Sequence, residues 1–176
     1  MQFKTVLLLL AMIFAVGSAW GQVDDDNHEV APPGMTQKQL NDLIEHYGDD
    51  VKLVGNAGEF RFNDVEMLVV SDANADRMRI ISPIAHISNV EPQMVVQAMA
   101  ANFHSVLDAR YAIGDDGTIY AAFIHPLSPL TEQQLASALR QVASAHETFG
   151  SSFSSGELVF PGPGGQQQPA PPPDSI

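Results

Sequence analysis

The stretch that most constrains the fold runs from residue 110 to residue 142 and predicts a β-hairpin followed by a helix. Two apolar runs, Arg110–Ile113 and Thr118–Ile124, are separated by Gly114-Asp115-Asp116-Gly117. A four-residue turn rich in Gly and Asp between two apolar runs is typical of a hairpin. We therefore expect two paired strands here, with the second strand leading into a helix.

Two helices carry the same start signal. Thr131 can cap the backbone N–H of Gln134, while Gln134 reaches back to Thr131, and Thr36 and Gln39 repeat this arrangement. Apolar residues recur at helical spacing after both caps. Pro92 suits the first position of a third helix. The apolar stripe of that helix contains Met94, Val95, Ala98, Met99 and Phe103.

Between the first two helices the sequence predicts antiparallel strands. Glu59–Phe62 alternates apolar and polar residues, as a half-buried strand does. Val65–Val70 and Arg77–Ser82 follow after turn-like segments, and Pro83 halts the last of these because proline cannot donate to a strand ladder. The three form a meander, and Val51–Val54 can add a short strand before it.

These elements predict one α+β domain: an antiparallel sheet of about five strands with three helices, in the order α-β-β-β-α-β-β-α. The domain spans residues 36–160, an ordinary length for one domain, with Glu157–Phe160 as a candidate last strand. The chain contains no Cys. Because no disulfide can stabilise it, the apolar core has to do so.

Residues 1–21 read as a signal peptide. Lys4 precedes the apolar run Val6–Val16, and small residues follow at Ala19 and Gly21. We expect cleavage after Gly21, with a cut after Ala19 as the alternative. A retained anchor fits less well because a spanning helix needs roughly 20 apolar residues. The expected location is periplasmic or secreted, without membrane insertion of the mature chain.

Two tails flank the predicted domain. Residues 22–35 contain Asp24-Asp25-Asp26 and three prolines or glycines, and residues 161–176 are rich in Pro, Gly and Gln. Both compositions predict disorder. The net charge of −13 argues against nucleic acid or an anionic membrane as partner, since both carry the same sign. Solubility explains this charge, and a basic protein partner would also suit it.

No motif predicts catalysis, a metal or a cofactor. The six His residues lack ligand spacing, and His146-Glu147 lacks the second His of a zinc-protease helix. Asp115-Asp116 lacks the alternating ligands of a calcium loop. The serines near Phe153 lack a Gly-x-Ser-x-Gly elbow, and Gly162–Gly165 precedes no helix that could bind phosphate. We therefore predict that the chain is not an enzyme.

Residues 102–149 resemble the YbjN-type family, which shares its fold with type III secretion chaperones of the Tir-chaperone kind. The matching pieces are Tyr111-Ala112-Ile113, the Gly-Asp-Asp-Gly turn, Ile119–Ala122, Pro126–Thr131 and the helix with Leu135, Leu139 and Val142. The resemblance implies an α+β domain that binds extended or partly folded polypeptide, often as a dimer, without catalytic residues. Secretion chaperones work in the cytoplasm, whereas this chain carries an export signal, and its tails depart from the family pattern.

The second hairpin strand is apolar on both sides, whereas a sheet with one solvated face alternates apolar and polar residues. One side carries Ile119, Ala121 and Phe123, and the other carries Tyr120, Ala122 and Ile124. Something must cover the second side, because large uncovered apolar patches are rare on monomers. The cover can come from the chain's own helices or last strand, from a dimer partner, or from a bound peptide. An exposed strand edge would also accept a guest strand.

We therefore predict an exported, non-catalytic module that binds polypeptide through an apolar sheet face or strand edge. The partner is a protein or peptide, or a second copy in a homodimer. The predicted contact residues are Phe60, Phe62, Tyr120 and Ile124, with ordinary core packing as the alternative. Two other functions remain open: a carrier of small apolar ligands between sheet and helices, and an unrecognised hydrolase.

Overall fold

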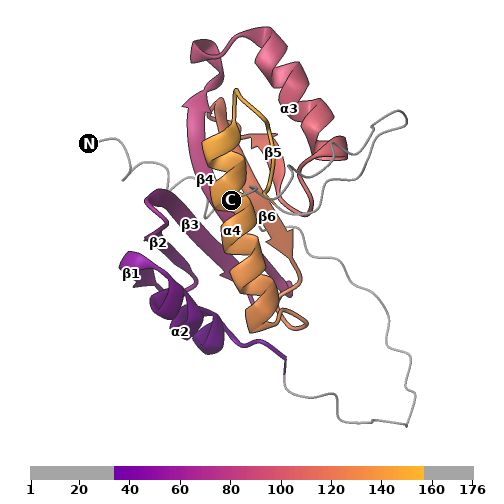
Figure 1. Cartoon of the computed structure of the whole chain (residues 1–176). Helices are drawn as coiled ribbons and strands as arrows, with labels where there is room; N and C mark the ends of the chain where they lie inside the picture. The colour runs from indigo at the N-terminus through magenta and orange to yellow at the C-terminus, as the bar shows by residue number, and fades with distance from the viewer. Residues whose placement is uncertain (1–33, 157–176) are drawn as a thin grey trace, which may run out of the picture. The chain divides into compact units, whose positions relative to one another are not determined.

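A computed structural model describes residues 34–156 and contains three α-helices beside a six-stranded antiparallel sheet (Figure 1). The predicted signal peptide, most of the acidic lead-in, the candidate strand Glu157–Phe160 and the C-terminal tail lie outside the described residues. The helices are α2 (Gln37–Tyr47), α3 (Pro92–His104) and α4 (Glu132–Thr148), with a short 3₁₀ helix, η1 (Ile87–Asn89). The strands are β1 (Asp49–Val54), β2 (Ala57–Phe62), β3 (Val65–Asp72), β4 (Arg77–His86), β5 (Arg110–Ile113) and β6 (Thr118–His125).

The predicted α+β class and element order are confirmed, with six strands in place of about five. Asp49–Val54 forms a full strand that pairs with β2. The sheet order is β1-β2-β3-β4-β6-β5, so α3 connects β4 to the outermost strand β5. Strand β4 continues beyond the predicted end at Pro83, because the ladder with β6 is irregular between Pro83 and Ala85. A proline is tolerated where regular pairing is interrupted.

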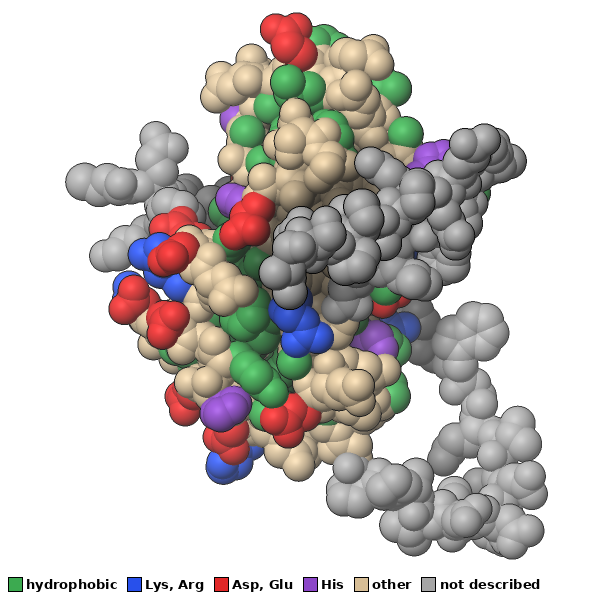
Figure 2. Space-filling view, in the orientation of Figure 1, with side chains coloured by type: hydrophobic (Ala, Val, Ile, Leu, Met, Phe, Trp, Pro, Cys, Tyr) green, Lys and Arg blue, Asp and Glu red, His purple; other side chains and the backbone are tan. Residues whose placement is uncertain are grey.

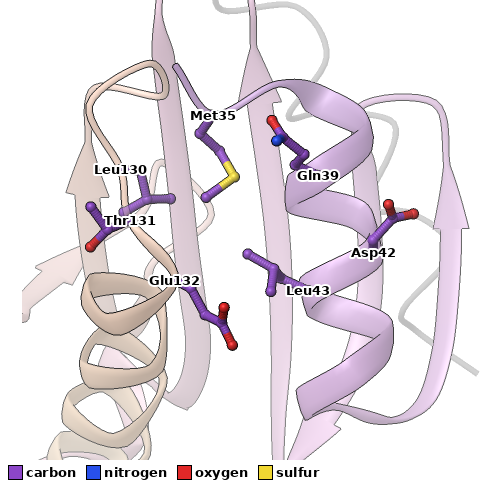
Figure 3. A pocket seen from close by; sticks show the side chains of 7 residues that line it. All are labelled: Met35, Gln39, Asp42, Leu43, Leu130, Thr131 and Glu132. Atoms are coloured by element: carbon purple, nitrogen blue, oxygen red, sulfur yellow. The ribbon is translucent and has the colours of Figure 1, made fainter. Parts of the chain in front are cut away.

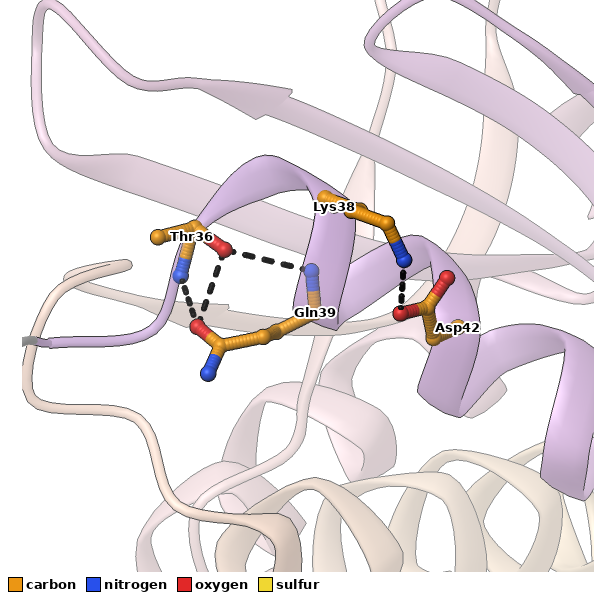
Figure 4. A network of polar contacts seen from close by, with 4 residues as sticks. All are labelled: Thr36, Lys38, Gln39 and Asp42. Atoms are coloured by element: carbon orange, nitrogen blue, oxygen red, sulfur yellow. Dashed lines mark hydrogen bonds and ion pairs between the residues drawn. The ribbon is translucent and has the colours of Figure 1, made fainter.

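Both predicted helix caps are present. At the start of α2 the Thr36 hydroxyl accepts from the Gln39 N–H (3.2 Å), and the Gln39 side-chain oxygen accepts from the Thr36 N–H (2.9 Å; Figure 4). Thr131 and Gln134 make the same pair of bonds at α4. Each cap contributes about 1 kcal/mol to helix stability. These local bonds fix where the two core-covering helices begin.

Helices α2 and α4 pack against one face of the sheet, which we call the inner face (Figure 1). Leu40 and Ile44 of α2 are fully buried there, as are Leu135, Leu139 and Val142 of α4. Their partners on the sheet include Phe60, Met67, Val69, Ile80, Ala121 and Phe123. The opposite side of the sheet, the outer face, carries the residues that alternate with these along each strand.

Helix α3 lies at the β5 edge of the sheet. The Asn102 side chain donates to the Tyr111 carbonyl (3.0 Å) and accepts from the Tyr111 N–H (2.7 Å). Because β5 is an edge strand, this amide occupies backbone groups that a guest strand would otherwise use. Strand addition is therefore disfavoured at this edge.

Candidate functional site

A groove of about 450 Å³ lies between the first turns of α2 and α4 (Figure 3). Its lining residues are Met35, Gln39, Asp42, Leu43, Leu130, Thr131 and Glu132. Apolar side chains also follow the seam between these two helices in Figure 2. The Tyr47 hydroxyl donates to Glu132 (2.9 Å) and thereby joins the two helices across this seam. This hydrogen bond is the main cause that raises the pKa of Tyr47.

One wall of the groove is held in place by Asp76. Its carboxylate accepts from the Ser128 N–H (2.6 Å) and the Ser128 hydroxyl (2.9 Å), and these bonds lower the pKa of Asp76. The Ser128 carbonyl accepts in turn from the Met35 N–H (2.9 Å). A turn between two strands thus positions Met35 beside Leu130. The acidic side chains at the rim give the groove a preference for neutral or cationic groups.

The four predicted contact residues fall on two sides of the sheet. Phe60 is 3% exposed and belongs to the inner-face core, and Phe62 is half-buried against that core. Tyr120 and Ile124 point to the outer face. The structure therefore places Tyr120 and Ile124 on the same face, four residues apart on β6, and separates them from Phe60 and Phe62.

The outer face is apolar at its centre, where Leu68, Ile81, Tyr120 and Ala122 are all buried. Tyr120 also donates from its hydroxyl to Asp116 (3.1 Å). Burial is the main cause that raises the pKa of Tyr120. Helices α2 and α4 lie on the opposite side of the sheet (Figure 1).

Toward one end of the outer face the apolar surface stays accessible, in a line of residues that we call the outer row. Successive strand partners place Val54, Ala57, Val70, Arg79 and Ile124 side by side across five strands. Val54 is 74% exposed and Ile124 is 58% exposed, and the three between them are half-buried. The outer row is thus an accessible apolar band with one cation in it.

A second accessible apolar surface lies on α3. Val96, Met99 and Phe103 are 60%, 59% and 80% exposed and follow one another at helical spacing. The buried side of this helix is made by the small residues Ala98 and Ala101. The predicted apolar stripe divides between two sides of the helix: Ala98 is buried and Met94 packs against the core, whereas Met99 and Phe103 face away from it. The available signal was the complete absence of Asp, Glu, Lys and Arg from the helix.

Within residues 34–156 no group of three or more His, Cys, Asp or Glu side chains is arranged to hold a metal ion. Each buried side-chain nitrogen or oxygen in this range has a hydrogen-bond partner. None of the helices in the described range is long and apolar enough to span a bilayer. Three candidate binding surfaces have been described in this range: the groove, the outer row and the α3 stripe.

Comparison with solved structures identifies the fold. A chain in the crystal structure of the ExsC-ExsE complex matches with a TM-score of 0.50 and 12% identity, over 65% of this chain and 96% of that one. The Yersinia pestis type III secretion chaperone SycH, solved with a fragment of YscM2, matches with a TM-score of 0.48 and 14% identity, over 62% of this chain and 98% of that one. A chain in the HopA1-SchA chaperone-effector complex matches with a TM-score of 0.40 and 12% identity, over 61% of this chain and 96% of that one.

At these identities the likeness shows a shared fold. No family model and no curated protein matches the chain. The comparison thus shows a fold shared with the chain from the ExsC-ExsE complex, and the resemblance to the YbjN-type family stays a prediction.

Proposed function

We propose that this chain is an exported, non-catalytic module that binds polypeptide segments on the outer face of its sheet. The observation that carries the proposal is the outer row, because an accessible apolar band beside buried Tyr120 and Ala122 can bury apolar side chains of a guest. The fold supports the proposal too, since the matching chain was solved in a complex of two proteins. Of the predicted contact residues, Ile124 is the one most accessible to a partner.

Selection from a library of displayed 12-residue peptides, using the mature chain as target, tests this function. We expect enriched peptides to bind wild type in fluorescence anisotropy and to lose at least tenfold in affinity with Ile124→Ser. Ile113→Ser is the matched control, because Ile113 is also an exposed strand residue but projects to the other side. Failure to enrich any peptide, or equal binding by Ile124→Ser, would contradict the proposal.

We further propose that two copies associate through the α3 stripe. An uncharged helix with three exposed apolar side chains suits self-association of an acidic chain, because no like charges meet at the contact.

We also propose that the chain is exported, because its first residues combine a basic residue, an apolar run and small residues, as signal peptides do. Intact mass of the protein recovered from a bacterial periplasm should correspond to a chain that begins at Gln22.

The groove favours a second candidate function, transport of a small apolar ligand. Met35, Leu43 and Leu130 offer an apolar lining, while Asp42 and Glu132 disfavour an anionic headgroup. A solvatochromic dye should then gain fluorescence with wild type and lose this gain with Leu43→Asp. An unchanged dye signal in that variant would remove the groove from consideration.

A further inference from the structure

The outer face collects most of the cations of a strongly acidic chain. The strand register places five of its eight Lys and Arg residues there: Lys52, Arg61, Arg77, Arg79 and Arg110. Four acidic residues share the face, Asp49, Glu59, Glu66 and Asp72. The chain as a whole has 21 acidic residues against 8 basic ones. Asp64 pairs with Arg61 and Asp116 accepts from Tyr120, so acidic groups accompany most of these cations.

Three of these cations are already engaged. Arg61 pairs with Asp64 (3.1 Å), and Arg77 donates to the carbonyl of Asp76 (2.8 Å). Arg110 turns back to the carbonyl oxygens of its own loop, among them that of Ala109 (2.6 Å). The side chains still available on the outer face are thus Lys52, at the edge, and Arg79, in the middle.

Arg79 has an apolar neighbour on each side. It lies on β4 with Val70 beside it on β3 and Ile124 beside it on β6, and its side chain is half-buried. Among residues 34–156 it forms no hydrogen bond and no ion pair. Arg77, on the same face two residues away, lies opposite Asp72, so Arg79 is the cation of this part of β4 without an acidic strand partner. A half-buried guanidinium in apolar surroundings pairs most favourably with a carboxylate, which it can hold with two parallel hydrogen bonds.

From this geometry we infer that the outer row binds a segment of a partner protein in which an Asp or Glu stands between apolar residues. The inference rests on the proposed function, because it assigns the chemistry of the same surface. The row crosses four strand spacings, roughly 19 Å in all. A segment lying along it places its carboxylate on Arg79 and its apolar side chains over Val70 and Ile124.

The net charge of the whole chain further restricts the class of partner that the outer row can bind. Nucleic acid and anionic membranes present many negative charges, which the net charge of −13 repels. A single carboxylate flanked by apolar residues avoids that repulsion and still satisfies Arg79. The preference at this row is opposite to the basic partner that the net charge alone suggested, because the polar group between Val70 and Ile124 is the cation Arg79.

Two matched peptides test the inference: fluorescein-labelled Gly-Ser-Val-Leu-Asp-Val-Leu-Ser-Gly and the same peptide with Asn for Asp. We expect the Asp peptide to bind the mature chain at least tenfold more tightly in fluorescence anisotropy. Arg79→Gln should abolish this difference. Arg140→Gln, which removes the same charge from α4 on the other side of the sheet, should preserve it.

A third peptide with Lys for Asp guards against a variant that merely misfolds. Arg79→Glu should bind the Lys peptide more tightly than wild type does, and a gain of binding cannot come from lost structure. Equal binding of the Asp and Asn peptides by wild type, with both dependent on Ile124, overturns the inference and leaves the proposed function standing. An Asp preference that survives Arg79→Gln also overturns the inference. Failure of all three peptides overturns the inference, and the library selection then decides the proposed function separately.

Discussion

At the scale of single residues, the buried side chain of Gln141 joins α4 to the loop before β5. It is 1% exposed on α4, and its side-chain oxygen accepts from the N–H groups of Asp108 (2.9 Å) and Ala109 (3.2 Å) just before β5. Gln141→Leu keeps the volume but leaves both donors unpaired, and each buried unpaired group costs about 1–3 kcal/mol. We expect the free energy of unfolding to fall by roughly 2–4 kcal/mol in urea titrations.

The exposed Gln133→Leu, on the same helix, is the control for this measurement and should change the free energy of unfolding by less than about 0.5 kcal/mol. A similarly small change with Gln141→Leu would show that water or a shifted backbone satisfies the two N–H groups.

His146 links stability to pH. The buried Ser82 hydroxyl donates to the Glu66 carbonyl (2.7 Å), so it accepts from Nδ1–H of His146 (2.8 Å). Burial lowers the pKa of His146 below 6.5, against a smaller opposing effect of Glu147. The unfolded chain therefore binds more protons in the window below pH 6.5, and stability present above that pH is lost as pH falls through the folded pKa. Urea midpoints between pH 7.5 and 5 should fall less steeply in His146→Gln than in wild type.

The exposed His104→Gln serves as control, and its urea midpoints should fall with pH as steeply as those of wild type.

The two capping pairs at Thr36 and Thr131 were predictable from the sequence, because each joins residues three apart. Gln141 and Arg79 were not, since their roles depend on residues that only the tertiary fold brings beside them.

At the scale of elements, α3 sets the expected oligomeric state. Its stripe exposes three apolar side chains, and burying each against a second copy contributes about 1.5–3 kcal/mol. We expect wild type to be a dimer in light scattering at micromolar concentration. The double variant Met99→Ser and Phe103→Ser should be monomeric, whereas Ile113→Ser should stay dimeric. A monomeric wild type, or a dimer that survives the double variant, would contradict this assignment.

Helix α3 also shows which features a local sequence pattern cannot predict. Alternation along β2 and the hairpin turn at Gly114–Gly117 are local, and the structure confirms both. A stripe with the spacing of Val95, Met99 and Phe103 looks the same whether the sheet or a second protein covers it. Alternation along β6 already groups Tyr120 with Ile124, but their separation from Phe60 and Phe62 depends on the register of strands far apart in the chain.

At the scale of the whole molecule, the charge distribution predicts opposite salt responses for the two surfaces. Two copies meeting at α3 bring together chains of net charge −13 each, and salt screens their repulsion. A carboxylate at Arg79 is held by attraction across the contact, which salt weakens. Sedimentation equilibrium should therefore show a tighter dimer at 0.5 M NaCl than at 0.02 M, by roughly threefold or more.

Over the same range the Asp peptide should bind more weakly, while the Asn peptide should change little, because its binding relies on apolar contacts. If the dimer weakened with salt, attraction between charged groups outside α3 would have to hold it together, and the uncharged stripe would not be the contact. If both peptides responded alike, their binding would not involve Arg79. The two salt slopes thus separate the α3 stripe from the outer row in one protein without any substitution.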